Sequence, residues 1–105
     1  MMDPVTVVGV DLDTKQERTL ERCLERCEAR GEVLWCRETG RGYHIRVRVP
    51  PCTYLESFVL RMELGDDPAR ILFDLRRYVA GAMTGIDVLF DSKIIYHRPL
   101  GTCDG

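Results

Sequence analysis

Residues 43–49 (YHIRVRV) decide the fold, because their hydropathy alternates at every position. The odd-numbered residues are apolar, whereas the even-numbered ones are His44, Arg46 and Arg48. Such alternation is typical of a strand with one face in the core and the other toward solvent. We therefore expect His44, Arg46 and Arg48 to lie together on the open face of a sheet.

A Gly-rich turn, residues 39–42 (TGRG), precedes this strand and carries Arg41. The connection is short, so residues 32–38 (EVLWCRE) are predicted to form the partner strand of a hairpin. Parity along that strand puts Trp35 on the same face as Val33. Stacking of nucleic-acid bases on Trp35 is therefore not expected, because it requires an aromatic ring on the open face.

The rest of the chain predicts two more strands and two helical regions. The strands are residues 5–12 (VTVVGVDL) and 87–91 (DVLFD), because both segments are rich in β-branched or other apolar residues. Apolar residues at helical spacing predict a helix that ends at Gly31. A second helical region is interrupted at Gly65, where Asp66-Asp67-Pro68 supplies the start signal of a new helix.

The resulting order is βαββαβ, which predicts an α+β fold of the ferredoxin-like or RRM-like type. This fold has a four-stranded antiparallel sheet, here in the order 4-1-3-2, with the helices on one face. Val88 and Phe90 of the last strand are expected in the same core as the first and third strands. We assign residues 1–98 to a single domain and residues 99–105 to a flexible tail.

Composition and charge limit the classes of function. The chain has 105 residues and a net charge of −2, so it has no overall attraction to nucleic acid or to a membrane surface. No apolar run approaches the ~20 residues of a membrane span. These features predict a cytoplasmic protein that does not bind membranes.

The amide and cysteine content points to a thermophilic source. The chain has no Asn and a single Gln, a depletion seen in proteins that work at high temperature. It also has five cysteines, and the interiors of hyperthermophiles can hold disulfides. We therefore expect some thiols to be paired, with one of Cys23 and Cys27 joined to Cys36 or Cys52.

The parity of the strands also predicts a group of carboxylates on the open face. Asp11 and Asp13 come from the first strand, and Asp91 comes from the last. Because the first and third strands are neighbours in this topology, the carboxylates would lie beside His44 and the arginines. Such oxygen ligands suit Mg²⁺ or Mn²⁺, which also take up substrate phosphates. DLDT also fits a simpler interpretation, in which it only ends a strand and caps a helix.

Three segments resemble motifs of the archaeo-eukaryotic primase superfamily, in the same order. Residues 8–14 (VGVDLDT) resemble its hydrophobic-DxD motif. Residues 38–47 (ETGRGYHIRV) resemble its second motif, a Gly-rich turn followed by x-His and a strand. Residues 86–93 (IDVLFDSK) resemble the third motif, a strand that ends in Asp. Residues 60–77 (LRMELGDDPARILFDLRR) are similar to small proteins of archaea and their viruses that carry a truncated core.

The resemblance implies a minimal primase-polymerase-like core that binds nucleotides or nucleic acid through Mg²⁺ or Mn²⁺. It implies metal-ligand and catalytic roles for Asp11, Asp13 and Asp91, with Asp87 and Asp74 as alternatives to Asp91. It also implies that His44 contacts the nucleotide phosphates. Nucleotidyl transfer is the activity such a core would carry, either intact or degenerate.

The basic residues of the open face add to this expectation. Arg46 and Arg48, with Arg41 from the turn, are expected to bind phosphate beside His44. Ordinary pairing of these arginines with nearby carboxylates is the alternative.

Two other classes of function stay open. One is a non-catalytic RRM-like adaptor that binds nucleic acid or protein. The other is a small structural or interaction protein of a virus or plasmid, located in the host cytoplasm and forming a homodimer through a strand edge or a cysteine. Dependence on metal separates the primase-like function from both.

Overall fold

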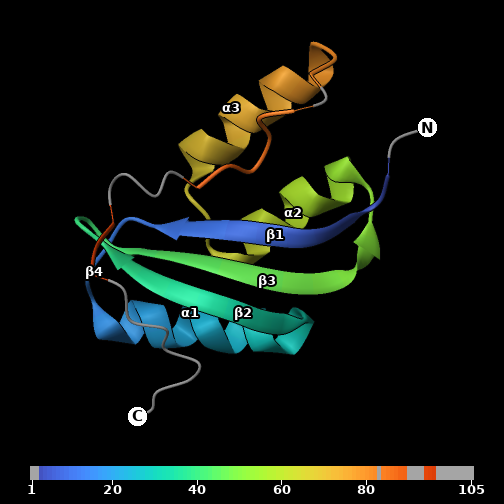
Figure 1. Cartoon of the computed structure of the whole chain (residues 1–105). Helices are drawn as coiled ribbons and strands as arrows, with labels where there is room; N and C mark the ends of the chain where they lie inside the picture. Colours follow the sequence, from blue (N-terminus) through green and yellow to red (C-terminus); the bar gives the residue numbers. More distant parts are fainter. Residues whose placement is uncertain (1–2, 83, 90–93, 97–105) are drawn as a thin grey trace.

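The computed structural model describes residues 3–82, 84–89 and 94–96 of the chain (Figure 1). The elements occur in the order β1 (Val5–Leu12), α1 (Glu17–Arg30), β2 (Glu32–Thr39), β3 (Tyr43–Cys52), α2 (Tyr54–Leu64), α3 (Pro68–Val79) and the short β4 (Ile94–Tyr96). The α+β class expected from the sequence is confirmed. No helix in the described part of the chain is long and apolar enough to cross a membrane.

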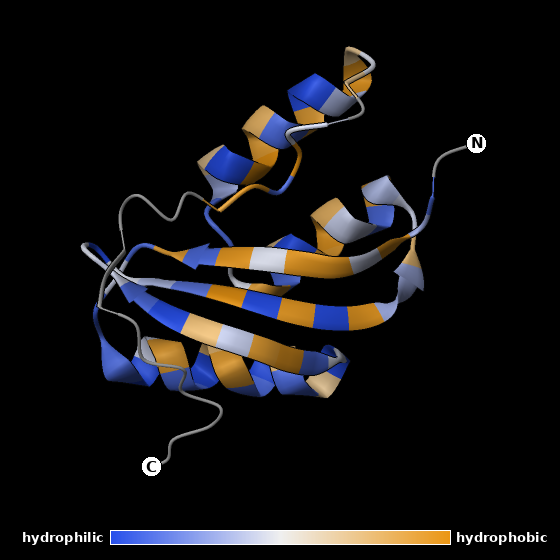
Figure 2. Ribbon diagram, in the orientation of Figure 1, coloured by the Kyte–Doolittle hydropathy of each residue, from blue (hydrophilic) through white to orange (hydrophobic). Residues whose placement is uncertain are grey.

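Three long strands form an antiparallel sheet with β3 in the middle, paired with β1 on one side and β2 on the other. The alternation along β3 is plain in Figure 2. Its apolar residues Tyr43, Ile45, Val47 and Val49 are all buried, as predicted. The sheet therefore has one apolar face and one polar face, as the sequence of β3 requires.

Helices α1 and α2 cover the apolar face of the sheet. Val8 and Val10 of β1 belong to the core on this face, and their side chains are inaccessible to solvent. Cys23 and Cys27 of α1 and Cys36 of β2 belong to the same core.

All three core cysteines and the half-buried Cys52 are free thiols, so the expected disulfide between them was wrong. The Sγ of Cys23 donates a hydrogen bond to the Leu64 carbonyl, 3.1 Å away. These buried thiols act as small apolar side chains.

The fourth strand differs from the prediction. Residues 87–89 are not in a strand, and Asp87 has a φ of +60°, which is incompatible with an extended chain. Val88 is 42% exposed, so its predicted place in the core was wrong, whereas Phe90 and Asp91 lie outside the described residues. The short β4 pairs with Glu38 and Thr39 of β2, at the edge opposite to β1. The predicted order 4-1-3-2 was therefore wrong for these elements.

A β-bulge in β2 changes the face on which Trp35 lies. Val33 pairs with Val47, but the next pair is Trp35 with Arg46, so one residue of β2 is inserted between them. An extra residue inverts the parity of everything that follows it. Trp35 therefore lies with Arg46 on the polar face, and the predicted shared face of Val33 and Trp35 was wrong.

The break between α2 and α3 follows the sequence signals. Gly65 has a φ of +99° and ends α2 in the left-handed region, which favours glycine. Asp67 caps α3 by accepting a hydrogen bond from the Ala69 amide at 3.0 Å, and Pro68 is the first helical residue. Helix α3 packs against α2 and extends away from the sheet beyond the edge of β1 (Figure 1).

Candidate functional site

The polar face of the sheet is arranged in rows that run across the three strands. One row contains Asp11 of β1, His44 of β3 and Arg37 of β2. The next row contains Gly9, Arg46 and Trp35, and the third contains Val7, Arg48 and Glu32. Residues in register on neighbouring antiparallel strands have Cβ atoms about 5 Å apart, so each row brings its side chains together.

Asp11 and His44 form a close pair, as the topology predicted. The Nε2 atom of His44 lies 3.5 Å from Oδ1 of Asp11, and the pair is ionic when the imidazole is protonated. The His44 side chain is 5% exposed, whereas that of Asp11 is 34% exposed. Asp11 is therefore the member of the pair that a ligand would reach first.

The other two outward residues of β3 also have acidic partners. Nη1 of Arg46 lies 3.2 Å from Oδ1 of Asp87, and its Nη2 donates to the Asp87 carbonyl at 2.8 Å. Nη1 of Arg48 lies 2.9 Å from Oε1 of Glu32, in a solvent-exposed pair. A phosphate group would have to displace Asp87 to reach Arg46, but only a weak surface contact to reach Arg48. Arg41 is exposed in the hairpin turn.

Charged side chains close the free edge of β1. The amide of Gly9 donates to Oδ2 of Asp87 at 2.7 Å, and the amide of Asp11 donates to Oδ1 of Asp66 at 2.8 Å. Nη1 of Arg70 in α3 donates to the Gly9 carbonyl at 3.2 Å. An edge strand has unpaired backbone groups that invite association with other chains, and these side chains satisfy them.

Gly9 is required at this edge because the two charged groups lie directly over it. A Cβ atom at this position would be 2.6 Å from both Nη1 of Arg46 and Oδ1 of Asp87. The segment at residues 84–89 lies against β1 where the fourth strand was expected. Side-chain contacts of Asp87, and not the backbone pairing of a strand, hold it there.

A buried network of charges connects this edge to the helices. Arg61 of α2 is 1% exposed and contacts Asp66 at 2.8 Å and Asp74 at 2.9 Å. Arg70 contacts Asp66 at 2.6 Å and also hydrogen-bonds to Asp87. The amide of Asp87 donates to Oδ2 of Asp74 at 2.9 Å, which completes the network.

Burial and pairing shift the pKa values of two of these groups in the same direction. Burial raises the pKa of Asp66 above its usual value, although Arg70, the Asp11 amide and Arg61 oppose the shift. Burial alone would lower the pKa of Arg70, but Asp66 and Asp87 raise it. Asp66 and Asp87 are thus engaged in holding the fold together. The same applies to Asp74, although its side chain also lines the pocket described below.

Little in the sequence predicts this network. Asp66 reads as part of a helix start, and Arg61 reads as one charge among many on an exposed helix. The available signal was the position of Arg61, three residues after Phe58 and three before Leu64, which places it on the buried side of α2.

The predicted carboxylate ligands are not gathered into one cluster. Asp13 is exposed and lies beyond the last residue of β1, and Asp91 is outside the described residues. Over residues 3–82 and 84–89, no group of three or more acidic, His or Cys side chains is placed to hold a metal ion. Asp11 alone, beside His44, fits an ion that obtains its remaining ligands from water and phosphate, as Mg²⁺ commonly does.

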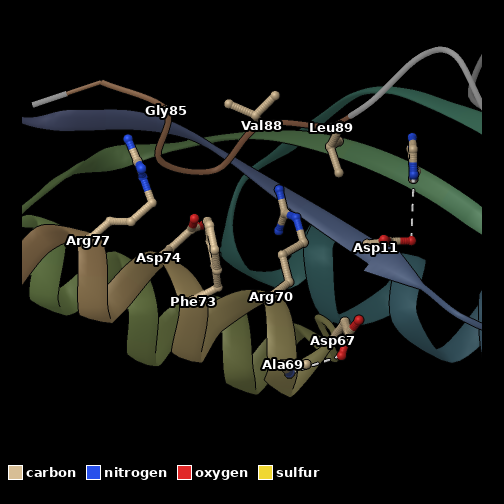
Figure 3. Close-up of a pocket in the computed structure, with 11 residues that line it drawn as sticks. Asp11, Asp67, Ala69, Arg70, Phe73, Asp74, Arg77, Gly85, Val88 and Leu89 are labelled. Atoms are coloured by element: carbon tan, nitrogen blue, oxygen red, sulfur yellow. Dashed lines mark hydrogen bonds and ion pairs between the residues drawn. The ribbon is translucent and has the colours of Figure 1, made fainter. Parts of the chain in front are cut away.

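A pocket of about 600 Å³ lies between this part of the sheet, α3 and the segment at residues 84–89. Its charged and polar lining is Asp11, His44, Asp67, Arg70, Asp74 and Arg77. The remainder of the lining is Ala69, Phe73, Gly85, Val88 and Leu89. Figure 3 shows Arg70 and Arg77 pointing from α3 toward the segment that carries Val88 and Leu89.

The pocket thus has a charged part and an apolar part. Asp11 faces the charged part, and the guanidinium of Arg77 lies 5.9 Å from the ring centre of Phe73. Nη2 of Arg77 also donates to the Thr84 carbonyl at 2.8 Å. Such a mixture of convergent polar groups and apolar walls is typical of sites for small organic ligands.

Comparison with known proteins adds no assignment, since no family model, curated protein or solved structure matches the chain.

Proposed function

We propose that this pocket binds a nucleotide together with the divalent metal ion carried by its phosphates. The observation that carries the proposal is the Asp11–His44 pair, with its atoms 3.5 Å apart at the wall of the pocket. A carboxylate suits a hard cation, and a protonated imidazole donates hydrogen bonds to phosphate oxygens.

The charge of the pocket favours a nucleotide that arrives with its metal. The lining includes three carboxylates, from Asp11, Asp67 and Asp74, against the guanidinium groups of Arg70 and Arg77. A bare triphosphate would be repelled by Asp11. An Mg²⁺ or Mn²⁺ ion between Asp11 and the phosphates replaces that repulsion by attraction, and the phosphates then complete its ligand shell.

The apolar part of the pocket suits the base. Phe73 is 62% exposed and Val88 is 42% exposed, so both offer surface to a flat ring. Phe73 supplies a face on which a base can stack, with the guanidinium of Arg77 beside it. The dimensions agree with this arrangement, because pockets for small organic ligands have volumes of about 300–1,000 Å³.

The proposal agrees with the resemblance to the primase superfamily at two residues, Asp11 and His44. Transfer of a nucleotidyl group would need a second carboxylate on the metal, and Asp13 and Asp91 are the candidates that the resemblance supplies. The end of a nucleic-acid strand would present the same phosphates as a free nucleotide. Arg48 and Arg41, both exposed, are the groups best placed to meet a longer strand.

Isothermal titration calorimetry with ATP tests the proposal. Wild-type protein is expected to bind ATP in the presence of Mn²⁺ and to lose most of this affinity when EDTA removes the metal. Asp11→Asn should weaken the Mn²⁺-dependent binding at least about tenfold, because it removes the carboxylate offered to the metal, and His44→Gln by a similar factor, because it removes the imidazole donor to the phosphates.

Glu32→Gln is the matched control, since Glu32 is an exposed carboxylate on the same face that lies outside the pocket. It should bind ATP as the wild type does. Equal binding with Mn²⁺ and with EDTA, or no binding at all, would contradict the proposal and favour an adaptor or a structural protein.

A further inference from the structure

The β-bulge in β2 places the only tryptophan of the chain on the polar face of the sheet, in register with Arg46. The guanidinium of Arg37 lies over the indole ring of Trp35, 4.2 Å from its centre. Trp35 remains partly accessible to solvent. An accessible aromatic ring on a sheet face is a feature that neither the pocket nor the core explains.

Arginine side chains surround Trp35, although Arg46 and Arg48 each have an acidic partner, Asp87 and Glu32. Arg46 lies opposite Trp35 on β3, Arg37 is two residues farther along β2, and His44 and Arg48 occupy the diagonal positions on β3. An arginine whose acidic partner is easily displaced can contact the phosphate backbone of nucleic acids.

One of these arginines, Arg48, can turn to a phosphate at low cost. The Arg48–Glu32 pair is exposed, with 60% and 67% of the two side chains accessible, and such surface pairs contribute little to stability. Arg37 stacks on Trp35 through the face of its guanidinium, so its N–H groups, which lie in the guanidinium plane, point sideways. Arg46 is held by Asp87, so it is not expected to contact a phosphate directly.

We infer that the polar face of β2 and β3 binds single-stranded nucleic acid, with a base stacked on the Trp35–Arg37 pair and the backbone contacted by Arg48. Exposed aromatic rings and guanidinium planes both stack on unpaired bases. Bases in a duplex are already stacked on each other, so the surface discriminates against double strands. This surface is distinct from the nucleotide pocket and does not depend on what the pocket binds.

The single tryptophan makes a direct test available. A titration of wild-type protein with single-stranded oligothymidylate of about twelve nucleotides, a length suited to one small domain, should quench the Trp35 emission in a saturable way. A duplex of the same length should produce no comparable quenching. A parallel titration with oligouridylate compares RNA with DNA. The oligonucleotide that binds more tightly identifies the kind of nucleic acid that this surface prefers.

Trp35→Leu keeps an apolar side chain of moderate size and removes the stacking ring. Fluorescence anisotropy with a labelled oligothymidylate should show at least about fivefold weaker binding for this variant. Arg48→Gln should weaken binding and flatten its dependence on salt. Tyr54→Leu is the matched control, because it removes an aromatic ring of α2 that lies outside the lining of the nucleotide pocket, and it should leave oligonucleotide binding unchanged.

Three results would overturn the inference. They are oligonucleotide binding that leaves the tryptophan emission unchanged, equal affinity of wild type and Trp35→Leu, and no binding at low salt. Loss of ATP binding in Asp11→Asn with oligonucleotide binding intact would separate the two surfaces and support both proposals.

Discussion

The carboxylate of Asp87 accepts a hydrogen bond from the backbone amide of Gly9 at 2.7 Å, although 78 residues separate the two in the chain. This contact fixes the segment at residues 84–89 against the edge of β1. It also sets one wall of the pocket, because Val88 and Leu89 follow directly after Asp87.

Gly9→Ala should destabilise the protein. The new methyl group would meet Arg46 and Asp87 at 2.6 Å, so one of them must move and its ion pair must lengthen. We expect a loss of about 1–3 kcal/mol in the free energy of unfolding, measured by urea denaturation. Val7→Ala, at an exposed position two residues earlier on the same face, should cost much less. Equal effects of the two substitutions would show that Gly9 has no special role.

Asp87→Ala should be more costly, because it leaves Arg46 and Arg70 without a shared partner. Their side chains are only 21% and 12% exposed, so water can compensate the two charges only in part. We expect a loss of about 3 kcal/mol in the free energy of unfolding.

Glu63→Ala serves as the control for this substitution. Glu63 pairs with Arg30 at an exposed site, and its loss should cost less than about 1 kcal/mol. Similar losses from the two substitutions would mean that Asp87 contributes only as a surface residue.

Thiol reactivity tests the placement of the cysteines. In native protein, Cys23, Cys27 and Cys36 should not react with a thiol reagent until the chain unfolds, because all three are inaccessible to solvent. Cys52 should react slowly, since burial and the nearby Glu56 raise its thiol pKa and reduce the thiolate fraction at neutral pH. Cys52→Ser should abolish that slow phase. Fewer than four free thiols in denatured, unreduced protein would contradict the structure.

The sequence predicted those features that depend on local pattern. Alternation along β3 placed His44, Arg46 and Arg48 on one face, and pairing of β1 with β3 brought Asp11 to His44. These predictions held because the side-chain period of a strand is two wherever no residue is inserted.

The errors arose where long-range contacts override local pattern. The bulge moved Trp35 to the other face, and nothing in residues 32–38 signals an inserted residue. Asp87 begins an apolar segment that resembles a strand, but its contacts with Gly9, Arg46 and Arg70 hold it at a positive φ. A network assembled from α2, α3 and a loop leaves no periodic signal in the sequence.

The most direct test of the nucleotide pocket is a crystal of the protein grown with Mn²⁺ and a non-hydrolysable ATP analogue, examined by anomalous diffraction at the manganese edge. We expect a manganese peak within about 2.5 Å of an Asp11 carboxylate oxygen, with phosphate oxygens completing the ligand shell and the base near Phe73. An ordered analogue bound away from Asp11 and His44, or a map with no manganese peak in the pocket, would contradict it.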